Sequence, residues 1–475
     1  MVSPKTHWII FSVGTSNNLQ YLVHTPRVFI LKIMAMGKSY YLDTYGCQMN
    51  VADSELIAGM LKKEGYVISK SMDSADAIFV NTCAIREHAE EKVHSRLGVY
   101  SQIKQNRPEV IIGVLGCMAQ HLKDEILESK PYVDIILGPD SYRKLPGLLH
   151  RKIKNTKSLV DTKLSRFEIY DNLFPSRQGG VNAWVSIMRG CDKFCTFCVV
   201  PFTRGRERSR SITSIVTEVH KAIAAGYVEI TLLCKNLNSF QHDDQKFQHL
   251  LQAVAEIPGV QRLRYTSPHP QDMTDEILRV MAKHENICNS VHFPLQAGAN
   301  RILKRMNRTY TKEHFVQRAQ WIREFLPNCG LSTDIIVGFP GETEAEFQDT
   351  LGVMNTVKFD SAFTFKYSLR TGTKAAEYSD QVPETEKQQR LEEVIKLQKR
   401  HTLSRNKAII GRVEKVLVEK VSKRSTTHWA GRTDSNKWVI FEKGGTEIKD
   451  IVPVLITDAK GISLQGHLVK LKEAA

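Results

Sequence analysis

The sequence lacks any hydrophobic run that reaches the roughly 18 apolar residues needed to cross a membrane. Its longest apolar blocks, such as Ala77–Val80 and Val110–Leu115, have the length of buried strands. It also lacks low-complexity tracts and solenoid-type repeats, and its hydrophobic and charged fractions, 42% and 25%, are close to globular averages. These features exclude membrane-spanning and fibrous classes. A length of 475 residues, at roughly 150 residues per domain, indicates about three domains.

Acidic residues are missing from the first 36 positions, which contain several basic residues. The apolar segment Trp8-Ile9-Ile10-Phe11 is too short for a secretory signal. We interpret residues 1–36 as an N-terminal extension, either a start-site artefact with translation beginning at Met34 or Met36, or an organellar presequence. The expected location is the cytoplasm, or an organelle if the extension is a presequence.

Positive charge predominates in the whole chain, with 66 Lys and Arg against 51 Asp and Glu, a net charge of +15. Such an excess favours a polyanionic partner, nucleic acid ahead of a membrane surface. The segment from Arg405 to Ala475 contributes 14 basic and 8 acidic residues to this balance. We therefore expect the C-terminal part to contact nucleic acid.

The nine cysteines are odd in number and unevenly spaced. This arrangement argues against a disulfide framework and for thiols that are kept reduced inside a cell. Their positions relative to the predicted strands are therefore the main indication of chemistry.

Residues 37–150 alternate between strand-like and helix-like segments, with strands predicted at Tyr40–Tyr45, Ala77–Asn81, Val110–Leu115 and Asp134–Leu137. Between the first two, Asp53–Glu64 has helical signals, with Asp53 as the predicted cap and Gly65 as the stop. This pattern predicts an α/β domain with a doubly wound parallel sheet. Residues 151–176 lose the apolar periodicity and are expected to be a linker.

Residues 177–404 contain six further strand and helix units, which predict a central partial (βα)6 barrel of parallel strands. Its strands are expected at Ala183–Met188, Val228–Leu233, Gln261–Thr266, Ser290–Leu295, Ser332–Val337 and Ala362–Tyr367. After a polar helix at Glu384–Arg405, residues 405–472 contain short alternating strands, including Val413–Val418, Trp438–Phe441 and Ile451–Ile456. These predict a small C-terminal antiparallel β-barrel.

Three cysteines follow the first predicted barrel strand closely, in the arrangement Cys191-x3-Cys195-x2-Cys198. Three thiolates at this spacing suit one iron–sulfur cluster with an open iron, whereas structural zinc needs a fourth ligand that the neighbourhood lacks. A zinc knuckle or a redox trio is the alternative interpretation. Because catalytic groups of parallel barrels gather at the carboxyl ends of the strands, this position favours chemistry over electron storage.

Three more cysteines each come directly after a predicted strand of the first domain: Cys47, Cys83 and Cys117. Residues at equivalent ends of parallel strands lie together at the crevice where ligands bind, so we expect these three thiols to converge. A second cluster with an open iron is the favoured interpretation. The alternative is three independent buried thiols, which is how Cys234, Cys288 and Cys329 are interpreted.

The spacing Cys191-x3-Cys195-x2-Cys198 at the mouth of a parallel barrel resembles the radical S-adenosylmethionine superfamily. Both trios together resemble, within it, the MiaB-type methylthiotransferases. The resemblance extends from about Lys38 to Leu471, and the C-terminal barrel resembles a TRAM domain. Further stretches that carry it are Tyr45-Gly46-Cys47-Gln48-Met49-Asn50, Asp53-Ser54-Glu55, His292-Phe293-Pro294-Leu295-Gln296-Ala297-Gly298, Arg305-Met306-Asn307-Arg308, Asp334-Ile335-Ile336-Val337-Gly338-Phe339-Pro340-Gly341-Glu342-Thr343 and Tyr367-Ser368-Leu369-Arg370-Thr371-Gly372-Thr373. The segment Gln48-Met49-Asn50 favours the RNA-modifying branch over the RimO-like branch, which modifies a ribosomal protein.

The resemblance implies two 4Fe-4S clusters, with S-adenosyl-L-methionine as methyl donor and radical source. It implies insertion of a methylthio group at carbon 2 of N6-(dimethylallyl)adenosine at position 37 of transfer RNA. An electron donor protein and a sulfur source are expected partners. The protein is expected to be a monomer that does not associate with a membrane. The alternatives are the same chemistry on a ribosomal protein side chain, or a non-catalytic RNA-binding iron–sulfur sensor.

Contacts to the two ligands are predicted from the same motifs. Residues predicted to bind S-adenosylmethionine are Asn236, Gln296, Gly338, Pro340 and Gly341. Residues predicted to contact RNA are Arg204, Arg206, Arg208, Lys423 and Arg424, although a basic loop exposed only to solvent is an equal alternative for the first three. Glu342 and Asp334 are expected to be turn and cap residues. The aromatic rings of Trp429, Trp438 and Phe441 are expected either to stack bases or to pack in the barrel.

The sequence departs from the family pattern at a few positions. Cys234-Lys235-Asn236 stands where the family usually has Gly-Gln-Asn, and Thr309 replaces a usual glycine. A lysine at position 235 is able to contact a carboxylate or a phosphate, and its role is left open by the sequence.

Overall fold

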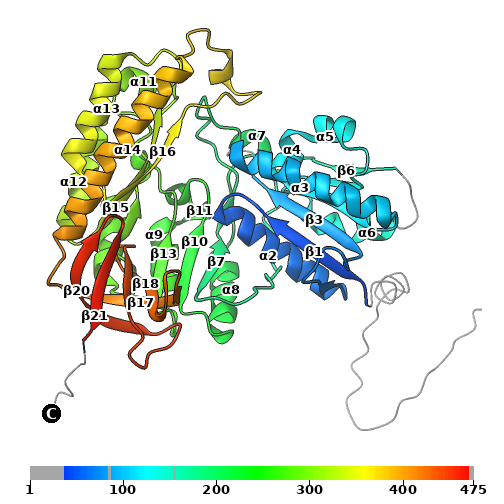
Figure 1. Ribbon diagram of the computed structural model, residues 1–475, viewed down its shortest axis with the longest axis horizontal. Coiled ribbons are helices and arrows are strands. Elements are labelled where there is room, and N and C mark those ends of the chain that lie inside the picture. Colours follow the sequence, from blue (N-terminus) through cyan, green and yellow to red (C-terminus); the bar gives the residue numbers. More distant parts are fainter. Residues whose placement is uncertain (1–36, 84–86, 153–156, 470–475) are drawn as a thin grey trace, which may run out of the picture.

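The computed structural model describes residues 37–83, 87–152 and 157–469, and the N-terminal extension at 1–36 lies outside them. Three bodies follow one another along the chain: an α/β domain, an open barrel and a small closed barrel (Figure 1). Within the described ranges no helix is long and apolar enough to cross a membrane.

The first body is built on a six-stranded parallel sheet with the strand order β2-β1-β3-β4-β5-β6. The strands are β1 (Ser39–Thr44), β2 (Val67–Ile68), β3 (Ala77–Thr82), β4 (Ile111–Gly116), β5 (Ile135–Leu137) and β6 (Leu159–Asp161). The four predicted strands of this domain are confirmed within a residue or two. Within the segment expected to be a linker, β6 pairs with β5, so the sheet extends beyond residue 150.

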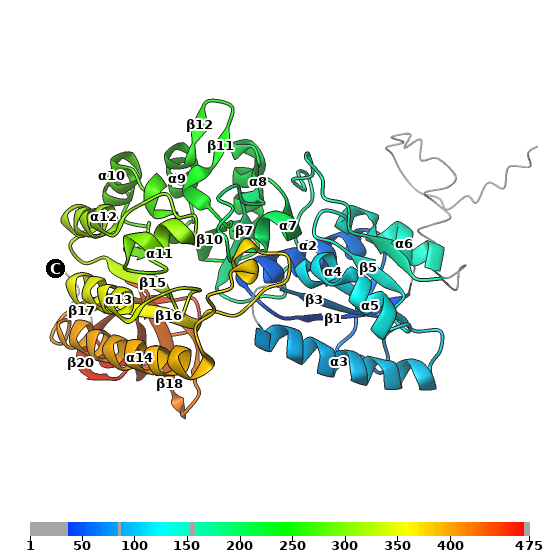
Figure 2. The same cartoon turned by 90° about the horizontal axis from the view of Figure 1, so that it is seen from above.

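Helices cover both faces of this sheet, which gives the doubly wound arrangement (Figure 2). They are α2 (Gln48–Lys63), α3 (Glu87–Asn106), α4 (Cys117–His121), α5 (Lys123–Ser129) and α6 (Leu145–Lys152). Helices α2 and α6 pack on one face, and α3, α4 and α5 pack on the other. Both faces of the central strands are apolar for this reason, as in β3, which is buried throughout.

The predicted cap at Asp53 is wrong. Helix α2 begins at Gln48 and is capped at Cys47, so Asp53 lies in its second turn and is buried. The helix ends after Lys63, and Gly65 adopts a positive φ of 89° beyond it, as the stop signal predicts. The carboxylate of Asp53 faces the second body rather than the helix N-terminus.

The second body consists of two three-stranded parallel sheets, β7-β10-β13 and β14-β15-β16, which an isolated bridge between Leu263 and Ile287 joins into one curved wall. Its strands are β7 (Asn182–Ser186), β10 (Glu229–Leu233), β13 (Arg262–Tyr265), β14 (Ser290–His292), β15 (Gly330–Val337) and β16 (Ser361–Lys366). These match the six predicted strands. A short antiparallel pair, β8 (Met188–Arg189) and β9 (Arg208–Ser209), and a hairpin, β11 (Gln241–His242) and β12 (Gln245–Lys246), are inserted between them.

Helices pack around the outside of this wall, and the largest apolar core of the molecule lies between them and the strands. They are α8 (Ile212–Ala224), α9 (Phe247–Ala255), α10 (Asp275–Lys283), α11 (Asn300–Arg305), α12 (Lys312–Phe325), α13 (Glu344–Val357) and α14 (Glu384–Lys407). The short helix α7 (Val200–Arg204) instead lies between the two bodies, against α4. On β15, buried residues that face this core alternate with half-buried ones such as Ser332 and Asp334 on the inner face of the wall.

The third body is a closed five-stranded barrel with the order β17-β18-β19-β21-β20. Its strands are β17 (Val413–Ser422), β18 (Ser425–Thr433), β19 (Trp438–Glu442), β20 (Ile451–Lys460) and β21 (Ser463–Leu468). Of the three aromatic residues in question, Trp429 and Phe441 are buried in the barrel core, whereas Trp438 is half-buried beside Lys420 and Arg432.

The turn between β18 and β19 closes the amino end of the large barrel. Arg262 donates to the carbonyl oxygens of Arg432 and Thr433 at 2.7 and 2.6 Å, and Arg264 donates to the Thr433 carbonyl at 2.7 Å. Glu229 accepts hydrogen bonds from Arg264 at 2.8 Å and from Arg432 at 2.9 Å. The small barrel is therefore fixed to the large one by buried charged groups that satisfy one another.

Candidate functional site

Cys47, Cys83 and Cys117 lie at the carboxyl ends of three adjacent strands, β1, β3 and β4. The side chains of Cys47 and Cys83 are close enough to interact, and Cys83 and Cys117 are both buried. The loop before Cys47 requires glycine, because Gly46 has φ 117° and an added Cβ would lie 2.5 Å from Cβ of Cys83. The predicted convergence of these residues follows directly from the parallel sheet.

Cys191, Cys195 and Cys198 lie in the loop that follows β8. The amide of Cys198 donates to the carbonyl of Cys195 at 2.9 Å, and the amide of Cys191 donates to the carbonyl of Gly205 at 3.1 Å, which folds the loop back on itself. Arg308, from the segment after α11, donates to the sulfur of Cys195 at 3.2 Å. Burial raises the pKa of Cys191 to about 12.

The two trios face each other across the seam between the first and second bodies. Arg204, at the end of α7, donates through Nε to the sulfur of Cys117 at 3.1 Å. Lys235, just after β10, donates to the sulfur of Cys47 at 3.4 Å. Apolar contacts complete the seam, with Leu233 packed near Cys47. The second body thus supplies the cations that lie nearest the cysteines of the first.

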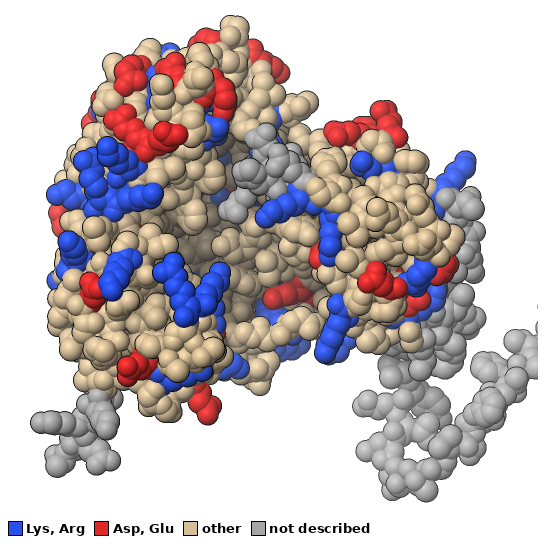
Figure 3. All heavy atoms as spheres, in the orientation of Figure 1, with Lys and Arg blue, Asp and Glu red and all other residues tan. Residues whose placement is uncertain are grey.

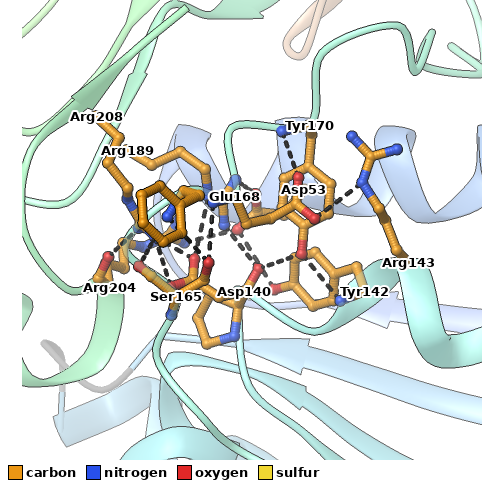
Figure 4. Close-up of polar contacts among 12 residues, drawn as sticks. Asp53, Asp140, Tyr142, Arg143, Ser165, Glu168, Tyr170, Arg189, Arg204 and Arg208 are labelled. Atoms are coloured by element: carbon orange, nitrogen blue, oxygen red, sulfur yellow. Dashed lines mark hydrogen bonds and ion pairs between the residues drawn. The ribbon is translucent and has the colours of Figure 1, made fainter.

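A buried ionic network joins the two bodies beside the first trio (Figure 4). The Asp53 carboxylate accepts from Arg189 at 3.0 Å, from Arg204 at 2.8 Å and from the Tyr142 hydroxyl at 3.4 Å. Burial opposes the charged form of Asp53, yet Arg204 and Arg189 hold the pKa of this carboxyl below its ordinary value. A matching pair, Asp140 with Arg208, lies next to it at 2.8 Å.

The donor atoms around the trios suit an anionic group that bridges several thiolates. In the described part of the chain, no three His, Cys, Asp or Glu side chains converge on the position of a single metal ion. The sulfurs that hold a four-iron cube bind different irons, so they are expected to lie farther apart than the ligands of one ion. Buried nitrogens without hydrogen-bond partners, Nη1 of Arg204 and Nη2 of Arg308, lie beside the first and second trio respectively. Three thiols with such free donors fit an iron–sulfur cluster at each trio.

The predicted S-adenosylmethionine residues surround the carboxyl end of the large barrel. Asn236 is buried and donates to Glu207 at 2.9 Å, while its Oδ1 is buried without a partner. Gln296 adopts a positive φ of 72° and pairs with β15 through its backbone. The contact of Asn236 and Gln296 with S-adenosylmethionine stays a prediction.

The glycines of the loop after β15 are required by protein contacts. Gly338 has φ 67°, and an added Cβ would lie 2.3 Å from the Lys387 side chain; at Gly341, with φ 75°, it would lie 2.3 Å from the Asp380 carboxylate. The loop, which includes Pro340, is held by Glu342, which accepts from the amide of Gly338 at 2.6 Å. Glu342 is thus a turn residue, as expected.

Asp334 is not a cap. It lies in the middle of β15, on the inner face, where its carboxylate is 3.2 Å from Nε2 of His292. The ring of Phe363 packs edge-on against His292 with centroids 5.8 Å apart and remains 54% exposed. Alternation along β15 and β16 is the sequence signal that places these residues on one face.

The residues predicted to contact RNA divide into two groups. Arg204, 1% exposed, and Arg208 are buried in the network with Asp53 and Asp140, so their guanidinium groups lie away from any RNA surface. Arg206 is exposed and pairs with Asp192 at 2.6 Å. Lys423 and Arg424 are exposed at the turn between β17 and β18. The prediction that Arg204 and Arg208 contact RNA is wrong, because the alternation of arginines in the sequence does not reveal their buried acidic partners on another domain.

Three family descriptions match successive parts of the chain. Residues 39–138 match Uncharacterized protein family UPF0004, residues 185–354 match the Radical SAM superfamily, and residues 407–469 match the TRAM domain. Each match falls on one of the three bodies of the structure.

Curated relatives cover nearly the whole chain. A protein of Phocaeicola vulgatus is 46% identical over 441 residues, 91% of this chain and 96% of its own length. Proteins of Porphyromonas gingivalis and Carboxydothermus hydrogenoformans are 45% and 44% identical and cover 91% of this chain and 95% and 99% of their own length. All three are named tRNA-2-methylthio-N(6)-dimethylallyladenosine synthase.

Solved structures support the fold. The radical S-adenosylmethionine methyltransferase TsrM from Kitasatospora setae, with cobalamin and a [4Fe-4S] cluster bound, matches with a TM-score of 0.54 at 14% identity over 72% of this chain and 77% of that chain. The cobalamin-dependent S-adenosylmethionine radical enzyme OxsB matches with a TM-score of 0.53 at 12% identity, over 75% of this chain and 58% of that chain. At these identities the similarity concerns the fold alone.

Proposed function

The chain belongs to the radical S-adenosylmethionine methylthiotransferase family of the tRNA-2-methylthio-N(6)-dimethylallyladenosine synthases, and we propose that it inserts a methylthio group at carbon 2 of N6-(dimethylallyl)adenosine at position 37 of transfer RNA. One observation carries this proposal: two cysteine trios lie on opposite sides of a single buried seam, as an enzyme that joins sulfur transfer to radical chemistry needs. Two 4Fe-4S clusters are part of the proposal, one at each trio.

When bound, S-adenosyl-L-methionine would supply the methyl group. Together with the clusters it would supply the radical that removes hydrogen from the base and the environment of the sulfur atom that is transferred. The protein residues bind and orient these groups. Cys191, Cys195 and Cys198 would hold one cluster, in a loop whose conformation is fixed by the hydrogen bonds from Cys191 to Gly205 and from Arg308 to Cys195. Cys47, Cys83 and Cys117 hold the other.

Water exclusion is the second contribution of the protein. The seam is closed by apolar contacts of Met49 and Ala52 with Leu233, and of Cys117 with Val199. On one side the seam is bordered by the Asp53 network, in which the Asp53 carboxylate pairs with Arg189 and Arg204. A carbon radical formed in such a place meets only the hydrogen that is presented to it.

The inner face of the large barrel suits the modified base. Phe363 and Phe365, 54% and 40% exposed, lie on the same face of β16, which the register places opposite Asp334 and Ile336 of β15. Exposed rings at a concave wall supply apolar contact for a branched five-carbon substituent. The neighbouring His292 and Asp334 supply hydrogen-bonding groups for the polar edge of adenosine.

A basic surface extends from α14 onto the small barrel. Residues 394–413 contain six Lys or Arg and no Asp or Glu. Exposed members of this surface are Lys396, Lys399, Arg400, Lys407, Arg412, Lys415, Lys420, Lys423 and Arg424. Figure 3 shows basic side chains gathered on the same side of the molecule, around a central hollow. Such a surface supports the binding of transfer RNA phosphates.

The test is anaerobic reconstitution of the full chain, followed by incubation with transfer RNA carrying N6-(dimethylallyl)adenosine, a reductant and S-adenosylmethionine. The expected results are about eight irons per chain and a methylthiolated adenosine in the RNA digest by mass spectrometry. The absence of the modified nucleoside, with 5′-deoxyadenosine still formed, contradicts the RNA substrate. An electron donor protein, a sulfur source and a monomeric state complete the proposal and are read out in the same reconstituted system.

A further inference from the structure

Lys235 donates a hydrogen bond across the seam to a cysteine of the first trio. Its Nζ lies 3.4 Å from the sulfur of Cys47, which belongs to the other domain, 188 residues away. Among the described residues no carboxylate forms an ion pair with Lys235. The thiolates that act most strongly on its ammonium are those of the first trio, Cys47, Cys83 and Cys117, while Arg204 opposes its charge.

Arg204 adds a second cation at the same trio. Its Nε donates to Cys117 at 3.1 Å, its Nη2 is paired with Asp53, and its Nη1 is buried without a partner. Two cations buried in one seam repel each other and lose hydration. Their placement therefore costs free energy unless an anionic group lies between them. Three thiolates that hold a cluster are such a group.

The second trio receives less positive charge. Arg308 contacts Cys195 at 3.2 Å, and Lys235 acts on Cys198 only through space. At the first trio, by contrast, two cations make direct contacts with sulfur. The sequence also carries a lysine where the resembling family usually has a glutamine, so one of these charges distinguishes this chain.

We propose that Lys235 is a positioning residue whose ammonium raises the reduction potential of the cluster at Cys47, Cys83 and Cys117 relative to that of the cluster at Cys191, Cys195 and Cys198. Reduction adds one negative charge to a cluster, and a nearby cation stabilises that added charge. The inference rests on the proposed function, because it needs both clusters. It concerns the order in which the two accept an electron.

The experiment is a potentiometric titration of the reconstituted full chain without RNA, followed by electron paramagnetic resonance of the reduced clusters. The variants are Lys235→Gln, Lys235→Met and Lys235→Arg, and the control is Lys283→Gln at the exposed end of α10. The two signals are assigned with a variant in which Cys191, Cys195 and Cys198 are replaced by alanine. Iron content is counted for every sample.

The Gln and Met variants are expected to shift the potential of the first cluster to more negative values, and by more than that of the second cluster. The Arg variant and the Lys283 control are expected to keep the wild-type values. Unchanged potentials, or an equal shift of both clusters, overturn the inference while leaving the proposed function intact. A wild-type chain with only about four irons overturns the two-cluster proposal and the inference with it.

Discussion

Asp53 and Arg204 lie 2.8 Å apart across the seam between two domains, 151 residues apart in sequence, and both side chains are buried. The same guanidinium contacts Cys117 at 3.1 Å. The pair therefore couples the docking of the domains to the geometry of a cysteine trio.

Replacement of Asp53 by alanine is expected to destabilise the protein by about 3 to 5 kcal/mol, because Arg189 and Arg204 would keep buried charges without their carboxylate. Urea unfolding monitored by fluorescence measures the loss. The matched control is Asp192→Ala, which removes the half-buried partner of the exposed Arg206, and its cost is expected to be much smaller because solvent screens this pair. Equal losses in the two variants would contradict the structural role of Asp53.

Removal of either cysteine trio is expected to halve the iron content. Alanine at Cys47, Cys83 and Cys117, or at Cys191, Cys195 and Cys198, should leave about four irons per reconstituted chain. Alanine at Cys329, which is buried outside both trios, serves as the control and is expected to retain about eight. Iron counting after anaerobic reconstitution separates these results.

Glu55 is expected to make stability fall as pH rises. Burial raises its pKa from 4.5 to about 7, Arg177 opposes this effect and Glu218 adds to it. Between pH 4.5 and about 7 the folded state holds a proton that the unfolded state has released, so the free energy of unfolding decreases with rising pH.

The Glu55→Gln variant has no titratable carboxyl at this position. Its difference from the wild type therefore isolates the contribution of Glu55 to the pH dependence of stability. From pH 4.5 to about 7, the free energy of unfolding of the variant is expected to rise relative to that of the wild type by on the order of 1 to 3 kcal/mol. Urea midpoints at several pH values measure the difference between the two proteins. A constant difference from pH 4.5 to pH 8 would show that Glu55 titrates normally.

Affinity for transfer RNA is expected to fall steeply with salt, because the basic surface releases counterions from phosphates. The double charge reversal Lys423→Glu, Arg424→Glu should weaken binding and reduce the log–log slope by about one per lost phosphate contact. Filter binding at several salt concentrations measures both quantities. The control reverses Lys62 and Lys63, which are exposed at the end of α2 in the first body. An equal loss in the control would remove the special role of the turn between β17 and β18.

The convergence of the cysteines was predictable from the sequence because it depends only on local signals. Each of Cys47, Cys83 and Cys117 follows a predicted strand, and parallel strands bring equivalent ends together whatever the helices between them. The trio of Cys191, Cys195 and Cys198 was equally predictable, because its members lie within eight residues of sequence. The longer apolar or alternating strands of the three bodies were predicted in the same way, whereas β2, β6, β18 and β21 were not.

Partners from distant segments were not predictable. The sequence suggests a helix cap at Asp53, because nothing near it reveals that Arg189 and Arg204 approach from another domain. For the same reason Arg208 resembled an exposed RNA contact although Asp140 neutralises it. Buried charges of this kind are specified by pairs of residues, and one sequence shows each member without the other.

The turn between β18 and β19, clamped by Arg262, Arg264 and Glu229, has a consequence for how the target nucleotide is chosen. An RNA held on the small barrel cannot swing relative to the open mouth of the large one, since the two share a buried ionic joint. The span between the two surfaces is then constant. An RNA bound on the small barrel would then present to the large barrel only nucleotides that lie at this distance along its fold.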